Sequence, residues 1–324
     1  MRAPEKARAA GSRTAALATA AVFLAFAVLP PLAQALGYGF VTLFATRFMI
    51  FAIAAVSLAL ILGHGAMVSF GHAAYLGLGA YAVGILADAG FSEFYVALPA
   101  ALLLSGLFAL VTGAVSLKTR GVYFIMITLA FGQMAYFTAT SLSAYGGDDG
   151  LTIWGRTEVF GSTVLSDNTV FYYTVLGCLV AVWLLCRMVV ASRFGRVLRA
   201  AKQSELRVRA IGIDPYAYKL TAYVLAGMIA GLAGALLANQ AEFVSPAYMT
   251  WHRSGELIVM VVLGGLGSFT GAILGATGFL VLEEVLSHIT EHWRLIFGPL
   301  LIIVVLFGRG GLMGLIRGRG RGHG

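Results

Sequence analysis

The sequence predicts an all-α polytopic membrane protein with about ten transmembrane segments. Of its 324 residues, 60% are apolar and only 11% are charged, whereas about a quarter of the residues in an average soluble domain are charged. The mean hydropathy is +0.89, and apolar runs of about 20 residues, long enough to span a bilayer, recur along the chain. These observations exclude a cytosolic enzyme, a disordered protein and a peripheral membrane protein.

The apolar runs define the expected spans. They cover residues 15–30, 41–62, 66–86, 95–115, 122–142, 170–190, 220–237, 256–286 and 293–307. The run over 256–286 is too long for one untilted helix, and its Gly/Ser cluster at 264–268 divides it into a short or re-entrant segment and a full span. The first run also resembles a signal peptide that ends at Ala33-Gln34-Ala35, but Pro30-Pro31 would equally end an uncleaved helix, which we favour.

The basic residues set the orientation. Eighteen of the 22 Lys and Arg residues fall in the N-terminal tail, at 118–120, over 187–219 and after residue 308, and ten alternating spans place these four segments on one side. The positive-inside rule then predicts that both termini are cytoplasmic. A net charge of +8 would suggest nucleic-acid binding in a soluble protein, but here it follows the topology, and we expect no nucleic acid.

One membrane domain accounts for most of the chain. We expect a cytoplasmic tail over 1–14, a single transmembrane domain over 15–310 and a basic Gly/Arg-rich cytoplasmic tail over 311–324. Within the domain, 143–168 would form an external loop and 191–219 a cytoplasmic segment. Gly-rich clusters at 69–81 and 264–275, one in each half, are consistent with a two-half internal repeat.

Catalytic chemistry is not visible in the sequence. None of the four lysines follows a phosphate-cradling Gly-rich loop, and there is no His-Glu-x-x-His motif and no nucleophile elbow. Cys178 and Cys186, eight residues apart in one apolar run, fit neither a disulfide framework nor a zinc site. We therefore expect no enzyme activity, cofactor or metal, and any energy must come from a gradient or from another subunit.

Polar and small residues in the spans are the candidates for a translocation pathway, because such groups tend to face the bundle interior. The candidates are Ser69, Gly71, His72, Thr128, Gln133, Gly267 and Ser268. Structural hydrogen bonds and close helix packing explain them at least as well. No charged residue is placed at the membrane midplane, since Arg47, Glu283 and Glu284 can each reach an interface. This weakens the hypothesis of a proton- or sodium-coupled carrier.

The segment from Ser192 to Lys202 is an amphipathic helix in the cytoplasmic region, with apolar residues at helical spacing and basic residues elsewhere on the turn. Two interpretations stay open: a basic helix lying on anionic lipid, or a helix that docks into a partner protein. After it, Gly212 interrupts the chain, and Asp214-Pro215 has the pattern of a capped helix start.

Several motifs, in order, resemble those of branched-chain amino acid ABC importer permeases, in particular the LivM-like branch. The run from Ser69 to Tyr81 is similar to the family's "S-L-G-H … G-A-Y" segment, with Phe70 where Leu is usual. Further similarities cover residues 119–131, 146–151, 192–219, 227–234 and 264–268. The tail after Gly311 matches no family role.

The resemblance implies a bacterial inner-membrane subunit that translocates branched-chain or related amino acids. Its partners would be a second, LivH-like permease, two cytoplasmic ATPase subunits and a periplasmic amino-acid-binding protein. It also favours docking over lipid contact for the amphipathic segment. The ATPase-coupling residues would be Phe194, Gly195, Arg196, Val197, Leu198 and Arg199. The alternative is an ion-gradient-driven carrier or channel for a small polar solute, and the sequence does not fix the substrate.

Overall fold

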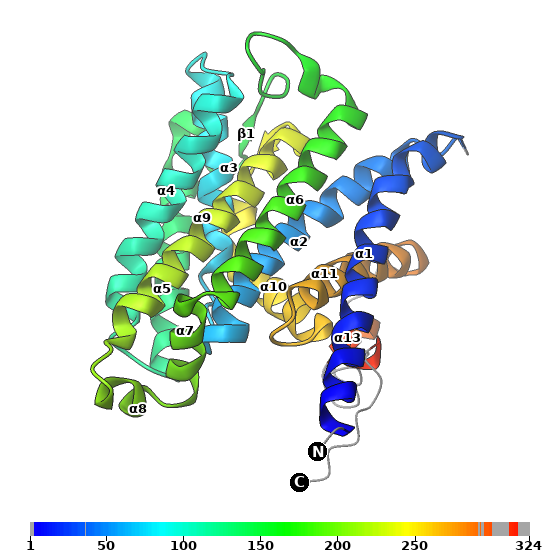
Figure 1. The fold of residues 1–324 in the computed structure, drawn as a ribbon. Helices are drawn as coiled ribbons and strands as arrows, with labels where there is room; N and C mark the ends of the chain where they lie inside the picture. Colours follow the sequence, from blue (N-terminus) through cyan, green and yellow to red (C-terminus); the bar gives the residue numbers. More distant parts are fainter. Residues whose placement is uncertain (1–2, 36, 291, 293–294, 300–310, 317–324) are drawn as a thin grey trace.

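The fold is known from a computed structural model, which describes residues 3–35, 37–290, 292, 295–299 and 311–316. The described chain is mostly helical (Figure 1). Its helices are α1 (Ala3–Ala35), α2 (Phe40–Gly65), α3 (His72–Asp88), α4 (Phe94–Ser116), α5 (Val122–Ser141), α6 (Asn168–Ala191), α7 (Arg193–Gln203), α8 (Glu205–Ala210), α9 (Pro215–Ala241), α10 (Trp251–Gly264), α11 (Phe269–Ile289) and α13 (Gly311–Ile316). Short 3-10 turns cover Ser143–Tyr145, Val164–Ser166 and Pro246–Met249, and β1 (Leu151–Thr152) pairs antiparallel with β2 (Phe243–Val244).

Seven helices in the described part of the chain are long and apolar enough to cross a membrane: α1 from Leu17, α2, α4, α5, α6, α9 and α11. This confirms a polytopic all-α membrane protein. Two other expected spans are shorter, since α3 has 17 residues and α10 has 14. Most of the last predicted run, 293–307, lies outside the described residues. The count of ten therefore stays a prediction.

The centre of the bundle is built from α2 and α9, with α3 and α4 packed against α9. In α2, the side chains from Met49 to Ile61 are at most 5% exposed. In α9, small residues let neighbouring backbones approach: a Cβ at Gly234 would lie 1.8 Å from the carbonyl oxygen of Leu76 on α3. Close backbone approach through small residues is how helices associate in a membrane, where apolar burial gives no driving force.

The junction between α2 and α3 differs from the sequence prediction. The third apolar run begins at residue 66, but α3 begins only at His72. Ala66 adopts a left-handed conformation (φ 54°) and its N–H bonds to the carbonyl of Ile61, which ends α2. Residues 66–71 are therefore not helical, although Ser69 has no exposed surface. Irregular backbone at membrane depth is tolerated where protein surrounds it.

The predicted break at 264–268 is present, between α10 and α11. A Cβ at Gly275 would lie 2.0 Å from the Met260 carbonyl oxygen, and one at Gly264 would lie 1.9 Å from that of Gly271. Gly267 has a different role: it adopts φ +91°, and a Cβ there would meet nothing within 4 Å. The loop itself abuts α2, because the Gly267 nitrogen would be 2.9 Å from a Cβ at Gly63.

The bundle has two distinct ends (Figure 1). We call "the basic end" the one formed by α7, α8, the loop 117–121 and the last turn of α2, which are joined by ion pairs and hydrogen bonds. The "β end" carries β1, β2 and the loop 143–168. At the β end, Asn239 accepts hydrogen bonds from Thr157, and Asp167 caps α6 through the backbone N–H of Thr169 at 2.6 Å.

Candidate functional site

The corner between α6 and α7 depends on a glycine. Ser192 is extended and α7 starts immediately after it. Gly195 then lies so close to α6 that a Cβ would be 2.3 Å from the carbonyl oxygen of Val190. Any larger residue would push the two helices apart. Gly195 therefore permits the sharp turn that folds α7 back against the end of α6.

The apolar face of α7 is turned inward. Leu198 has no exposed surface and Ala201 is buried, while the half-buried Phe194 ring packs on Tyr218 of α9 at 5.4 Å between centroids. Helix α7 thus covers α2, α6 and α9 of its own chain. Phe194 and Leu198, which the resemblance assigns to ATPase coupling, therefore pack on their own chain. Of the six candidate residues, Arg196 and Arg199 are exposed and Val197 is half-buried.

Two basic residues of α7 fasten it to the ends of other helices. Arg199 Nη1 donates to the Val190 carbonyl oxygen at 2.9 Å, and Lys202 Nζ donates to that of Gly63 at 2.7 Å. Both carbonyls lie in the last turn of a helix, where backbone carbonyls lack a partner within the helix and the helix dipole favours a cation. Arg199 therefore holds the α6–α7 corner instead of pointing to a partner.

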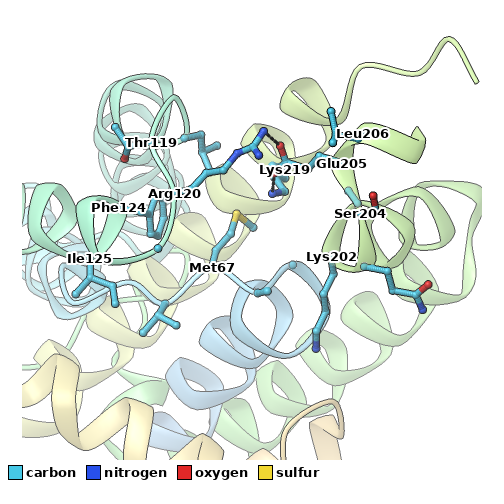
Figure 2. Close-up of a pocket in the computed structure, with 17 residues that line it drawn as sticks. Met67, Thr119, Arg120, Phe124, Ile125, Lys202, Ser204, Glu205, Leu206 and Lys219 are labelled. Atoms are coloured by element: carbon cyan, nitrogen blue, oxygen red, sulfur yellow. Dashed lines mark hydrogen bonds and ion pairs between the residues drawn. The ribbon is translucent and has the colours of Figure 1, made fainter. Parts of the chain in front are cut away.

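Helix α8 is joined to two further segments through one carboxylate. Glu205 accepts hydrogen bonds from Arg120 of the loop 117–121 and from Lys219 of α9 (Figure 2). The side chains of Glu205 and Lys219 are each 16% exposed, whereas that of Arg120 is 66% exposed. Because Glu205 and Lys219 are shielded from solvent, this pair is less screened than a surface salt bridge. The carboxylate connects α8, α9 and the loop between α4 and α5.

Two cavities flank this ion pair. One, of about 400 Å³, lies between the turn 65–68, the loop 117–121 and residues 201–206 (Figure 2). The other, of about 420 Å³, also borders Glu205 and includes Lys118, Arg209 and Tyr216. Next to them, Leu206 is 76% exposed and Ile211 is 72% exposed. Large exposed apolar residues beside basic cavities are suited to a protein partner. The sequence analysis missed Leu206, Ile211 and Glu205.

The chain after α8 folds as the sequence predicts. Gly212 adopts φ +81°, which an L-residue rarely takes. Asp214 Oδ1 then accepts a hydrogen bond from the Tyr216 N–H at 3.1 Å, with Pro215 in the first turn of α9. The predicted cap is confirmed. It fixes where α9, which carries Lys219, leaves the basic end.

The candidate pathway residues fall into two groups. Ser69, Gly71, His72 and Thr128 come together at the α2–α3 junction, where the backbone N–H of Phe70 donates to Thr128 Oγ1 at 3.3 Å. A Cβ at Gly71 would lie 2.3 Å from the Thr128 carbonyl oxygen. Gly267 and Ser268 lie apart from them in the α10–α11 loop, where Ser268 Oγ caps α11. Gln133 is half-buried on α5.

A buried polar chain continues from the first group. The Ser69 hydroxyl lies 3.2 Å from that of Tyr223, which accepts from the Tyr75 hydroxyl at 2.7 Å, and Tyr75 lies 2.8 Å from Thr112. His72 Nε2 lies 2.7 Å from the Ser57 hydroxyl. The chain links α3, α4 and α9 with the segment before α3, so these groups hold the helices in register. Tyr75, Thr112 and Tyr223 were not among the candidates from the sequence, because nothing in the spacing of three separate helices shows that these hydroxyls meet.

The fold and the site define a polytopic α-helical membrane protein with a structured basic end. The family described as the permease component of branched-chain amino acid transport systems matches residues 40–306, and the chain belongs to it. The chain is 28% identical to the high-affinity branched-chain amino acid transport permease LivM of Salmonella typhimurium over 84% of its length and 70% of the relative's. The LivM protein of Escherichia coli K12 is 27% identical over the same shares.

Two more distant relatives broaden the comparison. The permease LivH of Escherichia coli K12 is 27% identical over 51% of this chain and 53% of its own length. The autoinducer 2 import permease LsrC of Salmonella paratyphi B is 26% identical over 71% of this chain and 66% of its own length. These relatives are transport permeases, not enzymes. No solved structure matches the chain.

Proposed function

We propose that this chain is a membrane-spanning permease subunit of a bacterial ABC importer that moves branched-chain or related amino acids into the cytoplasm. The relatives named for branched-chain amino acid transport support the substrate class. In this proposal the chain lies in the inner membrane with about ten spans in two related halves. The basic end and both termini face the cytoplasm, as the positive-inside rule requires.

The partners follow from the same proposal. A second, LivH-like permease completes the membrane part, two ATPase subunits bind at the basic end, and a periplasmic binding protein delivers the amino acid at the β end. ATP hydrolysis belongs to the ATPase subunits. The polar residues at the α2–α3 junction, together with Gln133, Gly267 and Ser268, border the pathway or hold the helices that do.

The observation that carries the proposal is how α7 and α8 are fastened. Lys202 joins them to α2, Arg199 to α6, and Glu205 to α9 and to the loop 117–121. A partner that displaces this pair of helices therefore pulls on three membrane helices and on the loop between α4 and α5 at once. A subunit without its own energy source needs such a connection. Coupling between the ATPase contact and the transport pathway requires a structural element whose position both of them influence.

The contacts of α7 and α8 also separate the residues that hold these helices in place from those that stay available to a partner. Gly195, Leu198, Phe194 and Arg199 hold α7 against its own chain. Arg196 and the edge of Val197 remain for a partner, together with Leu206 and Ile211. Leu206 and Ile211 would supply buried contact area, and Arg196 would steer the approach of the partner. This is the usual division at an interface between apolar anchors and charged residues at the rim.

The experiment that tests the proposal is reconstitution. The tagged chain is purified with its associated subunits, and leucine uptake into proteoliposomes is measured with ATP, without ATP, and with an imposed proton or sodium gradient. We expect uptake only with the complete complex, ATP and the binding protein. Uptake by the purified chain alone that follows an ion gradient would refute the proposal and support the alternative, a secondary carrier or channel.

A further inference from the structure

Two arginines from different helices meet at one aromatic ring. The guanidinium carbons of Arg47 on α2 and Arg253 on α10 lie 5.9 Å and 6.0 Å from the centroid of the Phe51 ring. Arg253 Nη1 also donates to Glu256 Oε2 at 2.7 Å. Each guanidinium is held by the ring through a cation–π contact. The two positive charges are thereby concentrated at one place between α2 and α10.

Arg253 lies well inside the bundle, whereas Arg47 lies about two turns from the start of α2. Helix α10 ends at Gly264, and the loop after it abuts Gly63 at the basic end of α2. Arg253 precedes Gly264 by 11 residues, which is about 16 Å of helix, or about half of the ~30 Å hydrocarbon core of a bilayer. With the basic end at one membrane face, as proposed above, Arg253 lies near the midplane, where the sequence analysis expected no charge. The sequence analysis did not place Arg253 in a span, because the 31-residue apolar run begins only at Glu256.

The cluster is accessible. The side chain of Arg253 is 30% exposed and that of Glu256 is 24% exposed, and Arg47 is half-buried. Charged groups at this depth are costly and face a pathway or a bundle interior, not lipid.

The charges do not balance within the cluster. Among the described residues, the cluster has two guanidinium groups and one ion-paired carboxylate, that of Glu256. A second carboxylate would neutralise the excess, and guanidinium groups bind carboxylates with paired, directional hydrogen bonds.

We propose that Arg47 and Arg253 bind the carboxylate of the transported α-amino acid inside the membrane complex. The inference rests on the proposed function, since it makes this surface part of the amino acid's route. A carboxylate side chain from the second permease has the same chemistry, so the experiment has to separate the two sources.

The test uses the purified complex and two probes, L-leucine and leucinamide, which keeps the amine and side chain but lacks the carboxylate. We expect leucine to raise the melting temperature of the complex more than leucinamide does. Arg47→Gln and Arg253→Gln should remove this difference and lower uptake about tenfold or more, because a charge-assisted hydrogen bond is worth about 1.5–3 kcal/mol. Arg47→Lys, which keeps the charge without the planar fork, should fall between.

Arg187→Gln is the matched control, because Arg187 also lies over an aromatic ring, that of Trp183 at 5.2 Å, but outside the cluster. Equal shifts from leucine and leucinamide, or Arg47→Gln behaving like Arg187→Gln, would overturn the inference. So would loss of the second permease from the Gln variants, which would assign the arginines to a subunit contact. ATP-dependent uptake by the unmodified complex is measured in the same series, so failure of the proposed function is seen separately.

Discussion

Lys202 Nζ on α7 lies 2.7 Å from the carbonyl oxygen of Gly63 on α2, across 139 residues of sequence. The contact joins the segment that we expect to receive a partner's motion to the most buried helix of the bundle. Because Gly63 lies in the last turn of α2, its carbonyl would otherwise lack a partner in the helix. The lysine thereby makes the end of α2 and the α6–α7 corner move together.

Removing this contact should uncouple the complex more than it destabilises it. In Lys202→Met the apolar stem is kept and the hydrogen bond is lost, at a cost of about 1 kcal/mol. We expect a small drop in melting temperature but a clear drop in substrate-stimulated ATP hydrolysis. Lys118→Met is the control, because Lys118 is an exposed basic residue at the same end. Equal losses in both variants would show that only the charge of this end matters.

Glu205 should be more sensitive than any exposed acid of the chain. Glu205→Gln weakens the pairs with Arg120 and Lys219 together and leaves Lys219 shielded without a countercharge. Breaking a partly buried pair by removing one partner destabilises, and we expect about 1–3 kcal/mol, measured by thermal unfolding. Asp149→Asn, at an exposed position of the β end, should change little.

A charge swap tests the same pair directly. Glu205→Lys combined with Lys219→Glu restores opposite charges across α8 and α9, so it should recover part of the stability that Glu205→Lys alone loses. Arg120 would then face a lysine and keep the recovery incomplete. If the double variant loses as much stability as the two single variants lose together, the ion pair does not contribute to stability.

The glycines where α10 and α11 cross, Gly264, Gly271 and Gly275, should tolerate no methyl group. In Gly275→Ala the new Cβ would lie 2.0 Å from the Met260 carbonyl oxygen, so the helices must separate, at about 1–3 kcal/mol. Gly177→Ala on α6 adds the same group where nothing lies within 4 Å and should be neutral or stabilising, because alanine favours a helix. Similar melting temperatures for the two variants would argue against close packing at this crossing.

The orientation can be tested by labelling. In a chain without Cys178 and Cys186, single cysteines replace Ser166 at the β end and Gln203 at the basic end, both of which are exposed. An impermeant thiol reagent should label Ser166→Cys in intact cells and Gln203→Cys only after permeabilisation. Labelling of Gln203→Cys in intact cells would reverse the topology, since the basic residues would then lie outside.

Local signals in the sequence predicted local structure well. Asp214-Pro215 caps α9, the Gly/Ser cluster separates α10 from α11, and residues 193–203 form the predicted helix. The sequence did not show which way the apolar face of α7 points. An amphipathic helix shows its apolar face in the same way whether that face covers its own chain or a partner, so the sequence did not show that Leu198 packs on its own chain.

Contacts between distant segments were beyond the sequence. Arg120 and Glu205 are 85 residues apart, and nothing in their spacing indicates a pair. The start of α3 was also misplaced, because an apolar run does not show where a backbone leaves the helix when buried partners such as Thr128 satisfy its N–H groups. Arg253 was not placed in a span because its helix begins before the apolar run does.

The central claim is that a partner's motion enters this chain through α7 and α8. The most direct test is substrate-stimulated ATP hydrolysis by the reconstituted complex that carries Leu206→Asp and Ile211→Asp. Both side chains are exposed, so the chain should insert and melt normally, whereas Leu198→Asp, in the core, should prevent folding. We expect the double variant to lose stimulation about tenfold or more, as for hot-spot residues at an interface. Normal stimulation of ATP hydrolysis in the double variant would contradict the account.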